Sequence, residues 1–578
     1  MKKTLDVHLL IEPESTAGVI ASKWQEWNSA RQPWLTEKKE LRDYVFATDT
    51  KTTSNKKNGW FNSTTTPYLT QIYDNLKANY VASLFPQEKW MRWTGDDRES
   101  ATKAKVDVIQ GYVENKVRQS EFKKTAEHLV DDLLLYGNTF ATVEFVAEYT
   151  ETEQGEFIPG YIGPKTVRIS PFDICFDLTA SEFKDSPKII RSLVSIGEIK
   201  AMAEGGDPRM VEAFARIMAN RAAVVSGSGV QTEKSEAFVA DGFGSIELYY
   251  SSQYVEILTF YGDLYDINTG TLHSGRKITV VDRAYVLSDE PIASWLGVEP
   301  IRHAGWRDRP DNLLAMGPLD NLVGMQYRID HLENLKADVW DQIAYPIMKI
   351  RGYVEDFEHR PGAEINVGEE GDVTYLVPDA TALNSDLQIR ELQQRMEEIA
   401  GAPRQAMGIR TPGEKTAFEY QSLDNAAGRM YQHKTTKFEQ EFLEPLLNDF
   451  LECGRRNMDR GDLIRVLDDE TGVMLFESIT KEDITAKGKI VPIGARHFAE
   501  RARRVQNILQ LMQLKADPTI GAHLSGKEIA KVLAGELGEP NFYGENIQVD
   551  EQAETQKAAL DAEADLQETM QVAAEEGL

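Results

Sequence analysis

The clearest hydrophobic pattern along this 578-residue chain lies in its middle. Apolar residues there recur at steps of three and four, with one step of seven, at Leu322, Met325, Ile329, Leu332, Val339 and Ile343. Pro318 lies near the start, where its missing N–H costs nothing, and Pro346 ends the pattern because the residue before a proline avoids the α region. The spacing predicts a helix over residues 318–343, about 39 Å long at ~1.5 Å per residue.

Three further elements follow this helix. The sequence predicts a short β-type excursion, a second helix near Leu387–Ala400, a loop broken by glycine and proline, and a very long helix that runs to Glu452. A compact enzyme core seldom needs three long rods joined through a hairpin and a loop. The arrangement favours a tube assembled from several subunits.

The first 312 residues mix helical periodicity with alternation. Helices are expected in an opening segment with Trp24, Trp27 and Trp34, and near 67–84, 101–118, 121–136 and 196–222. Alternation predicts strands at 139–146, 168–177 (interrupted by a turn), 246–261 and 276–287, and a polar stretch at 48–66 reads as a loop. We therefore expect the α+β class, mainly helical, with residues 1–312 forming one domain or two closely packed ones.

The C-terminal part changes character. Short strands are expected over 463–493, an amphipathic helix over 497–514, and a further helix that opens with a capping box at Ser525–Glu528. After Asp550 the chain is rich in alanine, glutamate and glutamine. This last segment is either a frayed acidic tail or a helix that orders only in an assembly.

The net charge of −29 means that the average surface should repel nucleic acid and acidic membranes. Two segments invert this sign. From Gly401 to Lys437 six bases stand against three acids, and the loop in this segment carries Arg404, Arg410 and Lys415. From Thr485 to Arg504 a single acid stands against six bases, Lys487, Lys489, Arg496, Arg501, Arg503 and Arg504. Each patch either forms salt bridges between subunits or makes weak, salt-screened contacts with a polyanion.

Catalytic and metal motifs are not found. Gly408–Thr416 imitates a phosphate-binding loop, but Glu414 is inserted before Lys415 and a helix, rather than a buried strand, precedes it. There is no HxxxH, HExxH or GxSxG motif, and Cys175 and Cys453 have no metal-binding spacing. The sequence contains no run of about 18 apolar residues, so it predicts no membrane span. We expect no enzyme activity, no cofactor and no metal.

Several short motifs, taken in order, carry a family resemblance. They are Leu84-Phe85-Pro86 with Trp90-Met91-Arg92, Leu133 to Asn138, Pro318-Leu319-Asp320 opening a helix that contains Leu332 to Leu335, Arg410 to Ala417, and Phe442 to Leu447. In this order they resemble portal (head–tail connector) proteins of short-tailed, T7-like bacteriophages. The best match is the run from Arg410 to Ala417, because those connectors carry a similar run where their long helix begins.

The resemblance implies a portal fold with wing, stem, clip and crown, assembled into a dodecameric ring around a DNA channel. The implied parts are a wing at 1–312 and 417–495, stem helices at 313–343 and 384–401, a clip at 344–383 with a strand at 373–377, a channel loop at 402–416, and a crown with acidic tail at 496–578. Arg404, Arg410 and Lys415 would then contact DNA from the channel loop. The six bases between Thr485 and Arg504 would be a candidate lumen patch, and Leu322, Ile329, Leu332 and Val339 would pack between stem helices of neighbouring subunits.

The implied role is that of a ring at one capsid vertex for DNA packaging, retention and ejection, in the virion and, during assembly, in the host cytoplasm. The implied partners are further copies of the chain, major capsid and scaffolding proteins, terminase, tail adaptor and nozzle proteins, and double-stranded DNA bound without sequence specificity; no membrane is involved. Two other classes compete. A packaging ATPase would need a true phosphate-binding lysine after a strand, whereas a non-portal virion scaffold or adaptor protein stays open.

Overall fold

The computed structural model describes most of the chain up to residue 493. The described residues are 3–7, 13–46, 62, 64–85, 90–97, 99–151, 157–204, 208–225, 254–292, 301–352, 366–368, 370–376, 385–400, 433–458, 462–467 and 474–493. The chain divides into two units, Met1–Pro492 and Ile493–Leu578. The predicted helices at 497–514 and after Ser525, and the acidic tail, lie outside the described residues.

Helices dominate the N-terminal part: α1 (Pro13–Ala30), α2 (Gln32–Phe46), α3 (Tyr68–Leu84), α4 (Lys103–Gln119) and α5 (Phe122–Tyr136). The last three confirm the helices predicted from the apolar periodicity. Helix α5 ends at Gly137, whose φ of 73° is left-handed and whose N–H donates to the Leu133 carbonyl at 3.1 Å. A Cβ at this position would lie 2.4 Å from the Gly317 nitrogen, so only glycine fits here.

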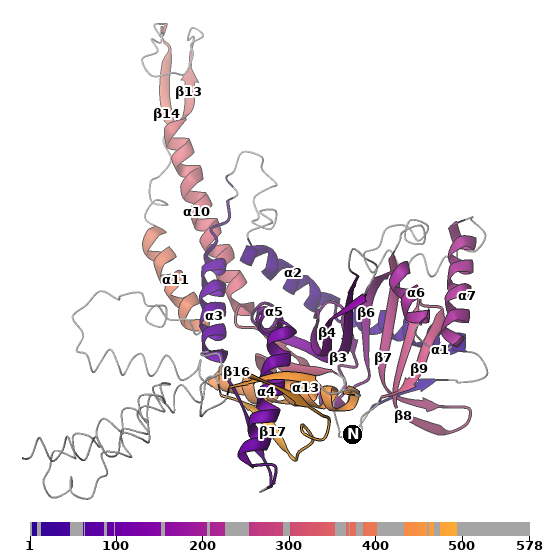
Figure 1. Ribbon diagram of the computed structural model, residues 1–578. Helices are drawn as coiled ribbons and strands as arrows, with labels where there is room; N and C mark the ends of the chain where they lie inside the picture. The colour runs from indigo at the N-terminus through magenta and orange to yellow at the C-terminus, as the bar shows by residue number, and fades with distance from the viewer. Residues whose placement is uncertain are drawn as a thin grey trace, which may run out of the picture. The chain divides into compact units, whose positions relative to one another are not determined.

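Two sheets follow these helices (Figure 1). In the three-stranded sheet, β3 (Asn138–Glu151) pairs on one side with β4 (Phe157–Ile169) and on the other with β10 (Arg302–Gly305). The six-stranded sheet has the order β5 (Ile174–Phe176), β6 (Lys188–Ser195), β7 (Tyr254–Asp266), β8 (Thr271–Val281) and β9 (Tyr285–Pro291), and β1 (Thr4–Val7) pairs in parallel with β7. The predicted mixture of helices and sheets is therefore confirmed, and helical residues outnumber strand residues in the described part of the chain.

Two sequence predictions merged elements that are separate. The predicted helix at 196–222 is α6 (Ile196–Glu204) followed by α7 (Pro208–Val225), because Pro208 begins a new helix. The predicted strand at 276–287 is the β8–β9 hairpin, with positive φ at Asp282 and Arg283. These two turn residues are fixed by buried ion pairs: Asp282 with Arg221 at 3.1 Å, and Arg283 with Glu256 at 2.7 Å.

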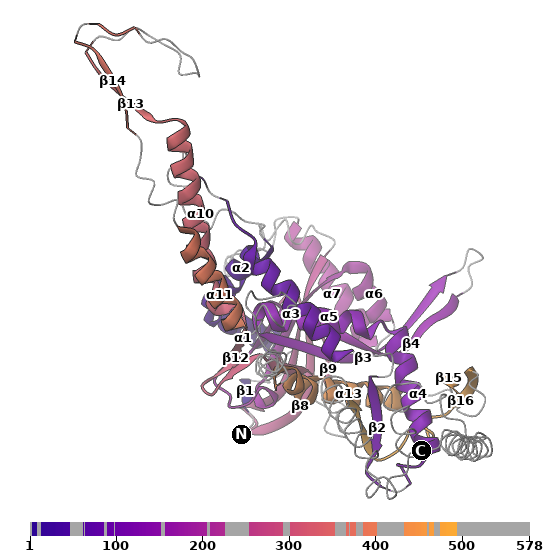
Figure 2. The ribbon, with the colours of Figure 1, turned by 90° about the vertical axis from the view of Figure 1, so that its left-hand side faces the viewer.

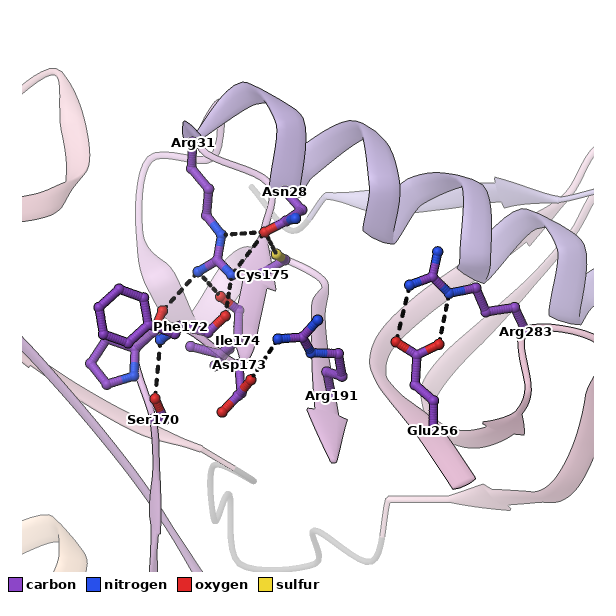
Figure 3. Close-up of polar contacts among 11 residues, drawn as sticks. Asn28, Arg31, Ser170, Phe172, Asp173, Ile174, Cys175, Arg191, Glu256 and Arg283 are labelled. Atoms are coloured by element: carbon purple, nitrogen blue, oxygen red, sulfur yellow. Dashed lines mark hydrogen bonds and ion pairs between the residues drawn. The ribbon is translucent and has the colours of Figure 1, made fainter. Parts of the chain in front are cut away.

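Arg31, at the junction of α1 and α2, ties these helices to the turn between β4 and β5 (Figure 3). Its guanidinium donates to the backbone carbonyls of Pro171 and Ile174 at 2.7 and 2.5 Å, and to that of Phe172 at 2.5 Å. It also donates to Asn28 Oδ1 at 3.2 Å. A buried turn needs partners for its carbonyl groups, and one planar cation supplies them here.

The C-terminal half begins with β11 (Arg307–Arg309), β12 (Asn312–Met316) and a 3₁₀ turn, η2 (Asp320–Leu322). Helix α10 (Val323–Ala344) follows, with the β13 (Ile347–Arg351) and β14 (Asp372–Leu376) hairpin at its far end and α11 (Asp386–Ala400) beside it (Figures 1 and 2). The predicted helices at 318–343 and 387–400 and the predicted strand at 373–377 are thereby confirmed.

The long helix predicted over 417–452 is described from residue 433 onward. It passes through a π-helical turn, η4 (Glu439–Leu443), into α13 (Glu444–Asn457). Pro445 lies in the first turn of α13 and lacks the N–H that would continue the regular α-helical bonding. The strands β15 (Asp462–Leu467), β16 (Met474–Ile479) and β17 (Gly488–Pro492) follow, and β17 pairs with β2 (Met91–Gly95).

The largest core unites helices from both halves of the chain. Phe122, Leu134, Ile329, Met396 and Phe450 are buried in it, from α5, α10, α11 and α13. The part of the predicted stem that contains Ile329 and Met396 therefore belongs to the main core.

Candidate stem, clip and channel residues

The apolar stripe predicted on the first stem helix is divided in two by the fold. Leu322 and Ile329 are both 0% exposed and pack in the chain's own core. Their predicted place between subunits is therefore wrong, because such burial leaves no surface for a neighbour. Leu332 is half-buried against the same core, and Val339 is half-buried. For these two residues packing between subunits stays a prediction.

The distal end of the same stripe is uncovered. Trp340 follows Leu322 by about five helical turns at ~3.6 residues per turn, so it lies on the same face of the helix. Its side chain is nevertheless 57% exposed, because the core does not extend that far along α10. Tyr327 and Leu335 are also exposed, on other faces of the helix.

The hairpin in the predicted clip exposes apolar side chains as well. Ile347 and Ile350 on β13 and Tyr375 and Leu376 on β14 are between 41% and 66% exposed. The two strands form a sheet of their own with five paired positions, from Ile347↔Leu376 to Arg351↔Asp372. A two-stranded hairpin is marginal by itself in water, and exposed apolar groups of this kind are typical of an interaction site.

A row of polar side chains on α10 was missed by the sequence analysis. Gln326, Asp330, Asn334 and Asp338 are buried and follow one another at intervals of four residues. They bind the backbone of residues 62 and 64–67, the segment that leads into α3 and that we name the strap, and the backbone of Leu69 in the first turn of α3. The N–H groups of Asn62, Thr64 and Thr66 donate to Asp338 Oδ1, Asn334 Oδ1 and Asp330 Oδ1 at 2.7, 2.8 and 2.9 Å.

The amide side chains of this polar row make further hydrogen bonds with the same stretch of backbone. Asn334 Nδ2 donates to the Thr64 carbonyl at 3.0 Å, and Gln326 Nε2 donates to the Thr66 carbonyl at 2.6 Å. Gln326 Oε1 accepts the Leu69 N–H at 3.2 Å. The signal in the sequence was the four-residue spacing of amide and carboxylate side chains on an otherwise amphipathic helix.

Asp330 is the electrostatic exception within this row. Its Oδ1 accepts two hydrogen bonds, from Thr66 and from Gln326, whereas its Oδ2 is buried and has no hydrogen-bond partner among the described residues. Burial raises the pKa of this carboxyl from 3.8 to about 6, although the two hydrogen bonds lower it.

Helices α10 and α11 are linked by polar contacts too. Lys336 Nζ bonds Asp386 at 2.5 Å, at the start of α11. This contact raises the pKa of Lys336 and lowers that of Asp386, as expected for an ion pair. Nearer the core, the Tyr68 hydroxyl donates to buried Glu397 on α11.

The predicted channel loop, with Arg404, Arg410 and Lys415, lies outside the described residues. Two other bases of the same sign-inverted segment are described. Lys434 donates to the Trp306 carbonyl at 2.6 Å and lies over the Trp306 ring, and burial lowers its pKa. Lys437 pairs with Asp308 and with Glu441. Both lysines are therefore bound to groups of the chain itself.

The candidate lumen patch is described only at its first two members. Lys487 directly precedes β17 and Lys489 lies in it, while Arg496, Arg501, Arg503 and Arg504 lie outside the described residues. Lys489 pairs with Glu444 at 2.5 Å, so its charge is compensated within the chain. The pKa of Asp97, in the facing turn, is lowered mainly by its hydrogen bonds with Ser100 and to a smaller extent by the charge of Lys487.

The described residues contain no group of three or more His, Cys, Asp or Glu side chains placed to hold a metal ion. Among them, no helix is both long enough and apolar enough to cross a membrane. Cys175 and Cys453 are not joined in a disulfide, and burial raises the pKa of Cys453 to about 11.

Residues 17–153 match the family model described as bacteriophage head to tail connecting protein. The resemblance to phage head–tail connectors is thereby confirmed, while the short-tailed, T7-like subtype stays a prediction. No curated protein matches the chain. One solved structure, described as the neck of an empty GTA particle computed with C6 symmetry, has a TM-score of 0.38 and 11% identity over 86% of this chain and 92% of its own.

Proposed function

We propose that this head–tail connector is a portal protein, a subunit of a ring that forms the DNA channel at one vertex of a phage capsid. The matched family supplies the connector role, over residues 17–153. The observation that carries the proposal is the uncovered apolar surface of the predicted stem and clip. Trp340, Ile347 and Leu376 expose more than half of their surface on slender elements that the subunit itself does not cover.

A ring gives these side chains a partner. Identical subunits that pack head to tail bury one flank of α10 and its hairpin against the other flank of the neighbour, and the interface closes when the rotation returns to the start. The dodecameric number comes from the resemblance. The predicted channel loop then lines the lumen, where the acidic character of the whole chain lets DNA slide while sparse bases keep it centred.

In this role the clip hairpin is the docking platform for tail adaptor and nozzle proteins, and terminase docks there during packaging. Capsid and scaffolding proteins contact the ring from outside. The chain works in the virion, has assembled in the host cytoplasm, and carries out no chemical reaction, needs no cofactor and binds no membrane.

Negative-stain electron microscopy together with analytical ultracentrifugation tests the proposal. Purified protein at micromolar concentration, with and without magnesium, should sediment as a large oligomer and show rings with a central hole. A strictly monomeric protein under all conditions would contradict the portal role. Closed assemblies without a hole would favour the alternative, a non-portal scaffold or adaptor of the virion.

A further inference from the structure

The contact between the strap and α10 rests on a match of two repeats. Residues four apart on a helix are separated by ~6 Å along its axis, and residues two apart on an extended chain by about 6.6 Å. Side chains at 330, 334 and 338 can therefore meet the backbone N–H groups of 66, 64 and 62 in turn. The helix side chains replace a neighbouring β-strand as partners of the strap.

The strap is held by these polar contacts rather than by apolar burial. Among its residues before α3, Asn62 and Thr66 are half-buried, Thr64 and Pro67 are exposed, and only Thr65 is buried. An attachment of this kind buries little apolar surface, so separating the strap from α10 exposes little of it to water. The core residues at the base of α10, such as Ile329, stay packed in such a movement.

One member of the polar row works against the closed contact. Asp330 has a buried oxygen that no group in the described part of the chain bonds, in a row where Gln326 and Asn334 use both ends of their amide groups. An ionised carboxylate in this place is stabilised only at Oδ1, and opening the strap returns the whole group to water.

We propose that the strap is a releasable latch on α10, closed by the polar row and loosened when Asp330 is ionised. Release frees α10, with the β13–β14 hairpin at its end, to change direction relative to α3 without unfolding the core. The latch itself is independent of the proposed function; its use for moving the stem within a ring rests on that function.

The pH dependence has a definite sign. In the closed state the pKa of Asp330 is about 6, against the ordinary value of 3.8 that solvation restores in the open state. The closed state therefore binds the proton more tightly, so closure is favoured at low pH and this gain is lost as pH rises through 6. The elements packed here carry other ionisable groups, among them Tyr68 and Glu397, which bond each other, and on α10 Tyr327, Arg328, His331, Glu333, Lys336, Asp338 and Asp341. None of these groups contributes to the shift at Asp330.

Hydrogen exchange on the purified protein, in whichever oligomeric state it adopts, tests the latch. The protection of peptides that contain Thr64 and Thr66, corrected for intrinsic exchange, should fall on the order of a hundredfold between pH 4 and pH 7.5. Peptides from β3 should keep their protection. In Asp330→Asn the pH dependence of the strap should be lost, and in the matched control His331→Gln, an exposed neighbour on the same helix, it should be unchanged.

A second variant separates a latch from an ordinary part of the core. Asn334→Leu removes both bonds to Thr64 and should raise exchange in the strap at every pH, at least tenfold, while β3 and the far-ultraviolet circular dichroism stay as in the parent. Strap protection that is equal at the two pH values, or that falls equally in Asp330→Asn, would overturn the role of the carboxyl. Exchange of the strap only together with β3 would overturn the latch. Neither result depends on whether the protein forms rings.

Discussion

Arg168 on β4 binds Asp132 on α5 through two hydrogen bonds of 2.6 Å each. The pKa values of the two side chains are shifted by different causes. The carboxylate raises the pKa of the guanidinium, whereas burial raises the pKa of Asp132 to about 6 although Arg168 lowers it. Arg168 therefore offsets only part of the cost of burying this carboxylate, whose side chain is 2% exposed.

Removing Arg168 should make stability strongly dependent on pH. Arg168→Gln leaves a buried carboxylate without its cation, which raises its pKa further, so the variant should lose about 2–4 kcal/mol at pH 7.5. A raised pKa means that the native state gains from protonation below that pKa and loses this gain as pH rises through it. The loss should thus be much smaller at pH 5. Urea unfolding at both pH values measures this loss in the free energy of unfolding. In the double variant Arg168→Gln with Asp132→Asn, the loss should be the same at pH 7.5 and at pH 5.

Two substitutions on α10 should have opposite effects on folding and assembly. Ile329→Asp puts a charge into the main core and should cost several kcal/mol, so the subunit should unfold or aggregate. Trp340→Asp changes an exposed side chain and should leave the circular dichroism and the thermal transition nearly unchanged. In the proposed ring it should nevertheless prevent assembly. Normal rings from Trp340→Asp in sedimentation and electron microscopy would mean that this end of the helix faces solvent.

The contrast between Ile329 and Trp340 shows what the sequence could and could not predict. The three-and-four spacing correctly predicted a long helix, because the spacing depends on the helix alone. Which neighbour covers each part of the stripe depends on where α11 and α13 fold back, many residues later. The strap was missed for the same reason: its partner row on α10 lies about 260 to 280 residues away in the chain.

Gly137 and Gly324 differ in backbone conformation and in the space around them, so substitution by alanine should have opposite effects on stability at the two positions. Gly137→Ala places a Cβ 2.4 Å from the Gly317 nitrogen at a left-handed φ of 73°, so the backbone must shift and the loss should be about 3 kcal/mol or more. Gly324→Ala lies inside α10 with nothing within 4 Å of the added Cβ, so it should gain about 0.5–1 kcal/mol from helix propensity. Differential scanning calorimetry compares the two variants. A neutral Gly137→Ala would mean that the β12–α10 connection adjusts without cost.

The channel loop provides the test of DNA contact. Arg404, Arg410 and Lys415 flank glycines and prolines in the loop predicted at 402–416, and the proposed ring repeats each of their charges around the lumen. Contacts of this kind to phosphate are salt-sensitive and carry no sequence information. Replacing all three with Gln should leave ring assembly intact, since none of the three belongs to the stem stripe.

The same triple variant should impair DNA packaging, retention or ejection in an infection assay, and the defect should not depend on genome sequence. Lys434→Gln with Lys437→Gln is the matched control for charge removed from the same segment, because these two lysines already bind groups of their own chain. Electron microscopy of each variant must first show that its rings form. The control should alter stability more than DNA transport. If the channel-loop variant packages, holds and delivers DNA at the parental level, then the loop is only structural, and the assignment of 402–416 to the channel loses its electrostatic support.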